Sequence, residues 1–150
     1  MRAINHALTG AVVGLTISNP IVAVGIAFVS HFALDAIPHY DDKRRFDLGT
    51  RGFTFILLLD ATLCLFLVAT LFAFSPDDWF MPSLCAFAAT SPDLMWISRY
   101  LTARVTGKDP GVKGVIQQFH HHIQWKAWPG GLWIELAWAT STVFLVTKLI

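Results

Sequence analysis

The sequence GFTFILLLDATLCLFLVATLFAFSP, residues 52–76, contains one charged residue, Asp60. About 20 predominantly apolar residues are enough for a helix to cross the hydrocarbon core of a bilayer. Three more apolar runs, at residues 3–40, 79–98 and 127–147, each contain one carboxylate and neither Lys nor Arg. We therefore predict an all-α fold, an integral membrane helical bundle.

The composition agrees with this class. Of 150 residues, 55% are hydrophobic and only 14% are charged, whereas a soluble domain carries about 25% charged residues. The length predicts a single membrane-embedded helical domain over residues 1–150. The formal net charge of +1 argues against nucleic acid as a partner.

The apolar runs predict about five helices. Pro20 follows Asn19 and splits the first run, because Asn-Pro favours a turn and Pro suits a first helical turn. Two short helices then form an N-terminal hairpin, and three transmembrane helices follow. Gly10 and Gly14 predict close packing against a neighbour, within the chain or in a dimer, and the oligomeric state stays open. The expected helices are residues 5–18, 20–37, 52–74, 78–100 and 131–150, with a short extra helix at 112–124.

The basic residues predict the orientation. If the first two helices form a hairpin, all eleven Lys and Arg except Lys148 fall on one side of the membrane. Such an excess marks the cytoplasmic side. Trp125 and Trp128 would lie at that interface.

The four carboxylates of the apolar runs are the candidate functional residues. Each costs a few kcal/mol in hydrocarbon, and no basic residue within the runs neutralises them, so we expect a shared cation. At about 1.5 Å per residue, all four lie in the cytoplasmic half of their helices. These residues are Asp35, Asp60, Asp93 and Glu135.

Histidines accompany these acids. His31 and Asp35 are spaced i, i+4 and share a helical face, which suits a pair of metal ligands. Mixed His and carboxylate ligands are typical of zinc or a similar divalent metal, and we expect two or three ions. Successive residues of a helix point about 100° apart, so one or two of His120, His121 and His122 are expected to reach the metal. The predicted metal ligands are His6, His31, Asp35, His39, Asp93, His120, His121 and His122.

The segment SHFALDAIPH, residues 30–39, resembles a segment of the zinc-dependent phospholipase C and single-strand nuclease superfamily. The chain is more similar still to the LexA-binding, inner-membrane-associated metal-dependent hydrolases. Their elements are matched by His6, by Ser91-Pro92-Asp93 and by the run at 119–122, although the order of the elements differs. The resemblance implies metal ligation by His31, Asp35 and His39, and a bacterial inner membrane location.

A multi-metal site open to the cytoplasm predicts a phosphoester hydrolase. Metal ions activate water and stabilise the charge of a reacting phosphate. Asp60 and Glu135 are the predicted catalytic acids, because a carboxylate must orient or deprotonate the water. Arg44, Arg45 and Arg51 are predicted to hold the phosphate through bidentate contacts. The expected partners are membrane lipid and a phospholipid or lipid-linked phosphate substrate.

Three other classes of protein fit the same residues. Buried acids and histidines can form the pathway of a metal or proton transporter. Facing histidines can ligate haem, and hydrogen-bonded acids can be structural groups of a non-catalytic interaction protein. Bound-metal stoichiometry separates the last class from the others.

Overall fold

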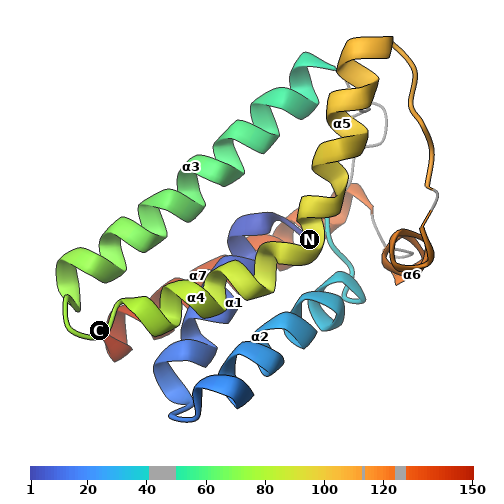
Figure 1. Ribbon diagram of the computed structural model, residues 1–150. Helices are drawn as coiled ribbons and strands as arrows, with labels where there is room; N and C mark the ends of the chain where they lie inside the picture. Colours follow the sequence, from blue (N-terminus) through green and yellow to red (C-terminus); the bar gives the residue numbers. More distant parts are fainter. Residues whose placement is uncertain (41–49, 113, 124–127) are drawn as a thin grey trace.

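The chain forms a bundle of helices, described here from a computed structural model (Figure 1). The structure describes residues 1–40, 50–112, 114–123 and 128–150. In order, the elements are α1 (Ala3–Thr16), α2 (Pro20–Asp35), α3 (Arg51–Phe74), α4 (Phe80–Thr90), the 3-10 helix η1 (Ser91–Leu94), α5 (Met95–Thr106), α6 (Val115–Ile123), the 3-10 helix η2 (Pro129–Gly131) and α7 (Leu132–Leu149).

Side-chain caps fix the starts of α2 and α3. The Asn19 side chain accepts hydrogen bonds from the backbone N–H groups of Ile21 and Val22, at 3.1 and 3.2 Å. The Thr50 hydroxyl accepts one from Phe53 N–H at 3.1 Å. Such caps satisfy N–H groups that have no partner within the helix. The predicted hairpin turn at Asn19-Pro20 is therefore confirmed.

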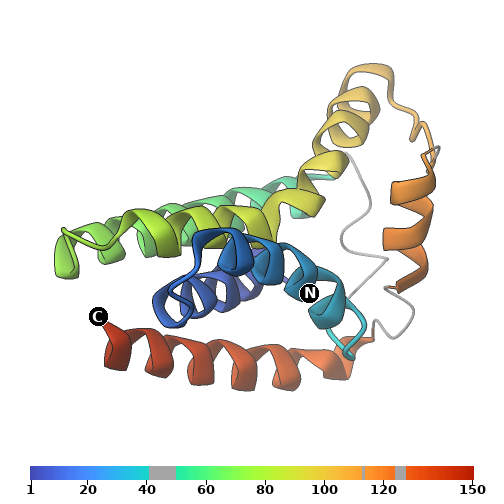
Figure 2. The same cartoon turned by 60° about the horizontal axis from the view of Figure 1, so that its bottom comes forward.

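The short helix α1 is the centre of the bundle. It contacts α2, α3, α4 and α7, and its 14 residues extend only about 21 Å, less than the hydrocarbon core of a bilayer. Its buried Ala7, Leu8 and Ala11 share one core cluster with Leu67 of α3 and Val146 of α7. Figure 2 shows α7 along one side of the α1–α2 hairpin and α3 and α4 along the other.

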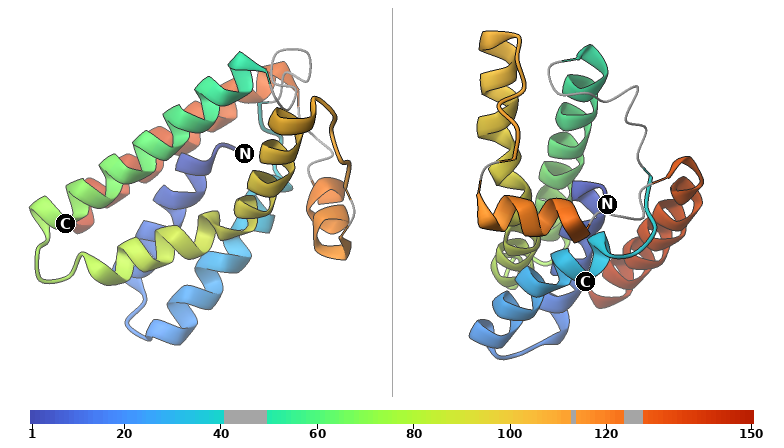
Figure 3. Two further views of the ribbon diagram at one scale, coloured as in Figure 1. Left: turned by 45° about the horizontal axis from the view of Figure 1, so that its top comes forward. Right: turned by 90° about the vertical axis from the view of Figure 1, so that its right-hand side faces the viewer.

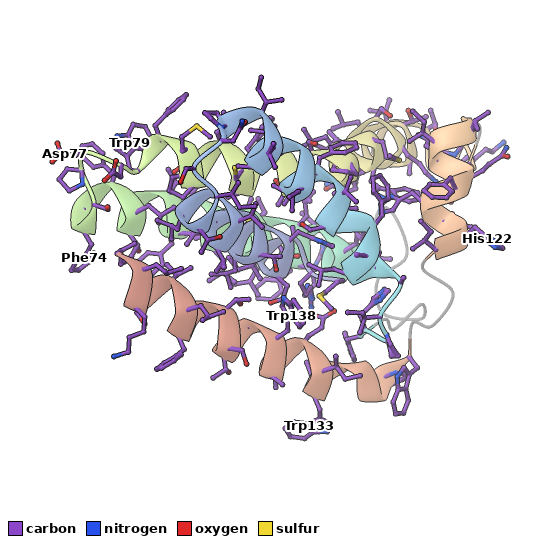
Figure 4. The ribbon with its side chains drawn as sticks, turned by 90° about the horizontal axis from the view of Figure 1, so that it is seen from below. Phe74, Asp77, Trp79, His122, Trp133 and Trp138 are labelled. Carbon is purple, nitrogen blue, oxygen red and sulfur yellow. The ribbon has the colours of Figure 1, made fainter. Side chains whose placement is uncertain are left out.

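Two helices are long and apolar enough to cross a membrane, within the part of the chain that is described. They are Arg51–Phe74, with 24 residues, and Pro129–Leu149, with 21 residues and η2 included. Only 17% of the apolar window of each is buried inside the structure, so most of each helix faces outward, unlike a core helix of a soluble protein. Figure 4 illustrates this on α7, where Trp133 points away from the bundle and Trp138 points into it.

The third expected span, residues 78–100, is not one straight helix. Its path changes at η1, which separates α4 from α5, and Figure 1 shows α5 turning away from the line of α4. Pro92 in η1 has no N–H group to donate within a helix. This break places Asp93 at the junction between two helix directions.

The two glycines of α1 permit its close packing on α4. A Cβ atom at Gly10 would lie 2.3 Å from the carbonyl oxygen of Cys85, and one at Gly14 would lie 2.6 Å from the Cα atom of Pro82. The expected close approach is therefore confirmed, and it lies within the chain. Backbone atoms cannot move aside as a flexible side chain can.

We predict that Gly10→Ala lowers the free energy of unfolding by about 1–3 kcal/mol, the usual cost of overpacking. Gly25 of α2 is the matched control, because a Cβ atom there has no neighbour within 4 Å. Gly25→Ala should raise stability by about 0.5–1 kcal/mol through helix propensity. Unfolding in detergent followed by circular dichroism measures both, and equal effects would contradict the packing described here.

Candidate metal centre

Four side chains from three segments bring their ligand atoms together at one end of the bundle. His31 and Asp35 come from α2, Asp93 from η1 and His120 from α6. One ligand atom from each lies within 4.8 Å of the other three, and this four-residue group can hold a metal ion. The spacing of His31 and Asp35 places both on one face of α2, as the sequence predicted.

Asp35 is the centre of the group. Its Oδ2 atom lies 2.6 Å from His120 Nε2 and 3.3 Å from His31 Nε2. Its Oδ1 atom lies 3.2 Å from His6 Nε2 and 2.5 Å from the amino nitrogen of Met1. Asp93 Oδ1 lies 3.8 Å from the Nε2 atoms of both His31 and His120. The buried carboxylate of Asp35 thus faces nitrogen atoms on both of its oxygens.

The tautomer of His31 tests whether the group suits a metal. Its Nδ1 lies 2.8 Å from the carbonyl oxygen of Ala89, and a carbonyl only accepts, so Nδ1 carries the proton. In a neutral ring Nε2 then presents its lone pair, 2.8 Å from Nε2 of His120 and close to two carboxylates. A single proton can bridge only two of these four donor atoms, whereas a metal ion can bind all four. Histidine ligands of metals usually donate their other N–H group in this way.

Ala89 can accept this hydrogen bond because of where it lies. It belongs to the last turn of α4, where carbonyl groups lack partners within the helix. Sequence reasoning did not identify this contact. The signal available was Pro92, which predicts a helix end and therefore unpaired carbonyl groups just before it.

Burial differs among the four residues of the group. The side chains of His31, Asp35 and His120 are fully buried, whereas that of Asp93 is 28% exposed. A molecule from outside therefore approaches the group at Asp93.

His120 contacts the ring of Trp96 on the α5 side, with the two ring planes tilted by 41°. Its ring centroid lies 5.8 Å from that of Trp96, and the Arg99 guanidinium lies 5.1 Å from the Trp96 ring. Arg99 also donates two hydrogen bonds to Asp109, and these bonds lower the pKa of the Asp109 carboxyl. The exposed segment that precedes α6 is thereby tied to α5.

The other predicted ligands, His6, His39, His121 and His122, are not members of this group. The His6 ring stacks on His31 with centroids 4.0 Å apart, so His6 adjoins the group without belonging to its four residues. His39 is buried, and its Nδ1 donates to the carbonyl of Ile37. His121 and His122 are exposed, and Figure 4 shows His122 at the outer end of the molecule.

Asp60 and Glu135 form a second group with Arg2. Arg2 Nη1 lies 3.6 Å from Asp60 Oδ2, and Arg2 Nε lies 4.0 Å from Glu135 Oε2. The backbone N–H of Tyr40 also donates to Glu135 Oε1 at 3.3 Å. These two acids therefore face a guanidinium and lie outside the four-residue group, and a cation shared by all four acids stays a prediction. The sequence signal for this contact is Arg2 itself, which immediately precedes the first apolar run.

The predicted phosphate-binding arginines are only partly described. Arg44 and Arg45 lie outside the described residues. Arg51 is the first residue of α3 and is exposed.

No known protein family, curated protein or solved structure significantly matches this chain.

We predict that His120→Ala lowers zinc affinity by at least about 100-fold, because losing a mere outer-shell partner of a metal site already costs 10–100-fold. His121→Ala is the matched control on the same helix and should change affinity little, since His121 is exposed. Zinc titration against a competing chelator measures both. Equal losses would contradict the position of His120 as the one of these two histidines that enters the group.

We also predict that Arg2→Ala lowers the free energy of unfolding by about 1–3 kcal/mol, because Asp60 and Glu135 lose their counter-charge while mostly buried. Arg104→Ala, on the exposed side of α5, should stay within about 0.5 kcal/mol of the parent. Thermal unfolding in detergent compares them. If the two variants unfold alike, Arg2 does not stabilise the bundle.

Proposed function

We propose that this chain is a membrane-embedded, metal-dependent hydrolase of phosphoesters, acting on a phospholipid or another lipid-linked phosphate. The observation that carries the proposal is the buried group of His31, Asp35, Asp93 and His120, which can hold a metal ion. Its mixed nitrogen and oxygen donors suit zinc. We place the protein in the bacterial inner membrane with the site toward the cytoplasm.

The position of the group supports a lipid substrate. It lies at the end of the bundle where α3 and α7, the two candidate spans, begin (Figure 2). A phosphate at the headgroup level can reach this end while its acyl chains stay in the bilayer. The exposed face of Asp93 gives such a phosphate access to the group.

A bound divalent ion would act as a Lewis acid and would lower the pKa of water. The chain orients its own ligands for this. The hydrogen bond to Ala89 fixes the ring of His31, and Asp35 is held between histidines on both of its oxygens. Asp93, with part of its side chain exposed, is the acid best placed to orient an incoming water.

The resemblance noted in the sequence adds support. The elements that are similar to the inner-membrane hydrolases contribute His31 and Asp35, Asp93, and His120, which are far apart in the chain and form one group in space. Asp60 and Glu135 remain candidate catalytic acids, but their contacts with Arg2 favour a structural role. Of the three arginines predicted to bind phosphate, Arg51 is the one that lies within the described residues, and it remains a candidate.

A metal or proton transporter is the second candidate. The buried charged side chains supply its possible pathway: Asp35, Asp60 and Glu135, together with buried histidines. All of them lie toward the end where α3 and α7 begin, which favours a site open to one side over a path across the membrane.

The test is hydrolysis of phospholipids by the zinc-loaded protein in mixed micelles, followed by ³¹P NMR. We expect turnover that a chelator abolishes and that Asp93→Asn lowers by at least about 100-fold. Asp77→Asn, an exposed acid at the opposite end of the bundle (Figure 4), should retain activity. Zinc binding without any phosphoester hydrolysis would refute the proposed activity and favour transport.

A further inference from the structure

Helix α6 has a buried edge and an exposed apolar edge. His120 is fully buried in the metal centre, whereas Val115, Ile116 and Phe119 are 83%, 67% and 55% exposed. At about 100° per residue, these three residues form one edge of the helix, next to His120. The proposed hydrolase activity uses His120 and leaves the apolar edge without a role.

This edge continues onto α2. The ring of Phe119 lies 5.7 Å from that of Phe32, which lies 5.5 Å from that of Phe28. Phe28 and Val29 are exposed on α2. The apolar edge of α6 is therefore part of a larger apolar surface that includes the outer side of α2.

The direction of α6 differs from that of the candidate spans. Figure 2 shows α6 running across the direction of α7, and the right-hand view of Figure 3 shows it running across α3. Its nine residues extend about 14 Å, too short to cross a bilayer. A short helix across the spans, near the end where they begin, matches the geometry of a helix in the membrane interface.

The flanking sequence fits the same location. Lys113 precedes α6 and Lys126 follows it, and basic residues are attracted to anionic headgroups. Trp128 comes soon after and is exposed, and Trp is enriched at membrane interfaces. Basic flanks and a nearby exposed Trp are the features of a helix at an anionic lipid surface, so a bilayer suits this edge better than a second copy of the chain.

We propose that α6 is an interfacial helix: its edge of Val115, Ile116 and Phe119 lies in the boundary region of the bilayer, and this contact holds His120 in the metal centre. The inference rests on the membrane location given under the proposed function. It adds that the lipid surface itself contacts α6, the helix that contributes His120 to the group.

Single cysteines test the lipid contact. In a Cys64→Ala/Cys85→Ala background, Ile116→Cys and Gln118→Cys carry an environment-sensitive fluorophore, with Phe66→Cys on exposed α3 as the reference for lipid. The protein is reconstituted in phosphatidylcholine vesicles with added phosphatidylglycerol. Nitroxide-labelled phospholipid and aqueous iodide serve as the two quenchers.

We expect the nitroxide lipid to quench the labels at 116 and 66, and iodide to quench the label at 118. Equal iodide quenching at 116 and 118 would overturn the inference. Quenching at 116 by a nitroxide on a second copy, lost on dilution into more lipid, would overturn it in favour of a dimer. A label at 66 that lipid does not quench would refute the membrane location itself.

The link to the metal centre needs its own variant pair. Ile116→Asp should weaken zinc binding in vesicles by about 10-fold, the scale of an outer-shell effect, because a charge pulls the apolar edge from the bilayer and moves His120. Gln118→Asp, on the other side of the same helix, should leave zinc affinity unchanged. Unchanged affinity in Ile116→Asp would show that the lipid contact does not hold His120.

Discussion

The buried carboxylate of Asp35 is the constraint on which the rest of the structure depends. A fully buried charge is costly unless counter-charges and hydrogen bonds surround it. Asp35 receives them from three helices: His6 of α1, His31 of its own helix α2, and His120 of α6. The same group therefore joins α6 to the hairpin and belongs to the candidate metal centre. A substitution of Asp35 would therefore disturb both the attachment of α6 and the candidate metal centre.

The negative charges of the four acids in the apolar runs are compensated in two ways. Asp35 and Asp93 face histidine nitrogens, whereas Asp60 and Glu135 face the guanidinium of Arg2. Arg2 thereby links the start of α1 to α3 and α7, the two candidate spans. Asp35 and Asp93 belong to the candidate metal centre at the end of the bundle, and Asp60 and Glu135 link the central helix to the helices around it through Arg2.

Much of the fold could be predicted from the sequence, because apolar run length and the Asn19-Pro20 turn are local signals. The predicted bounds of the first three helices agree with α1, α2 and α3 to within two residues. The i, i+4 pair of His31 and Asp35 was equally local. The break at η1 was not foreseen, although Pro92 marks it, since Pro is tolerated within membrane helices and does not fix a change of direction.

Contacts between distant segments were harder to predict. Which of three consecutive histidines enters the site depends on how α6 lies against α2, and no local pattern encodes that. The role of Arg2 was missed because it depends on α1 being central, a property of packing. The carbonyl of Ala89 carries no side-chain signal, yet it decides which nitrogen of His31 can face a metal.

Elemental analysis of the detergent-purified protein by mass spectrometry measures whether the group of His31, Asp35, Asp93 and His120 binds a metal ion. The parent chain is compared with His31→Ala/Asp35→Ala, after confirming by circular dichroism that the variant remains helical. We expect at least one zinc or similar divalent ion per chain in the parent and none in the variant. A folded parent that contains no metal would contradict this expectation, and the histidine and aspartate group would then be a proton-binding or structural cluster.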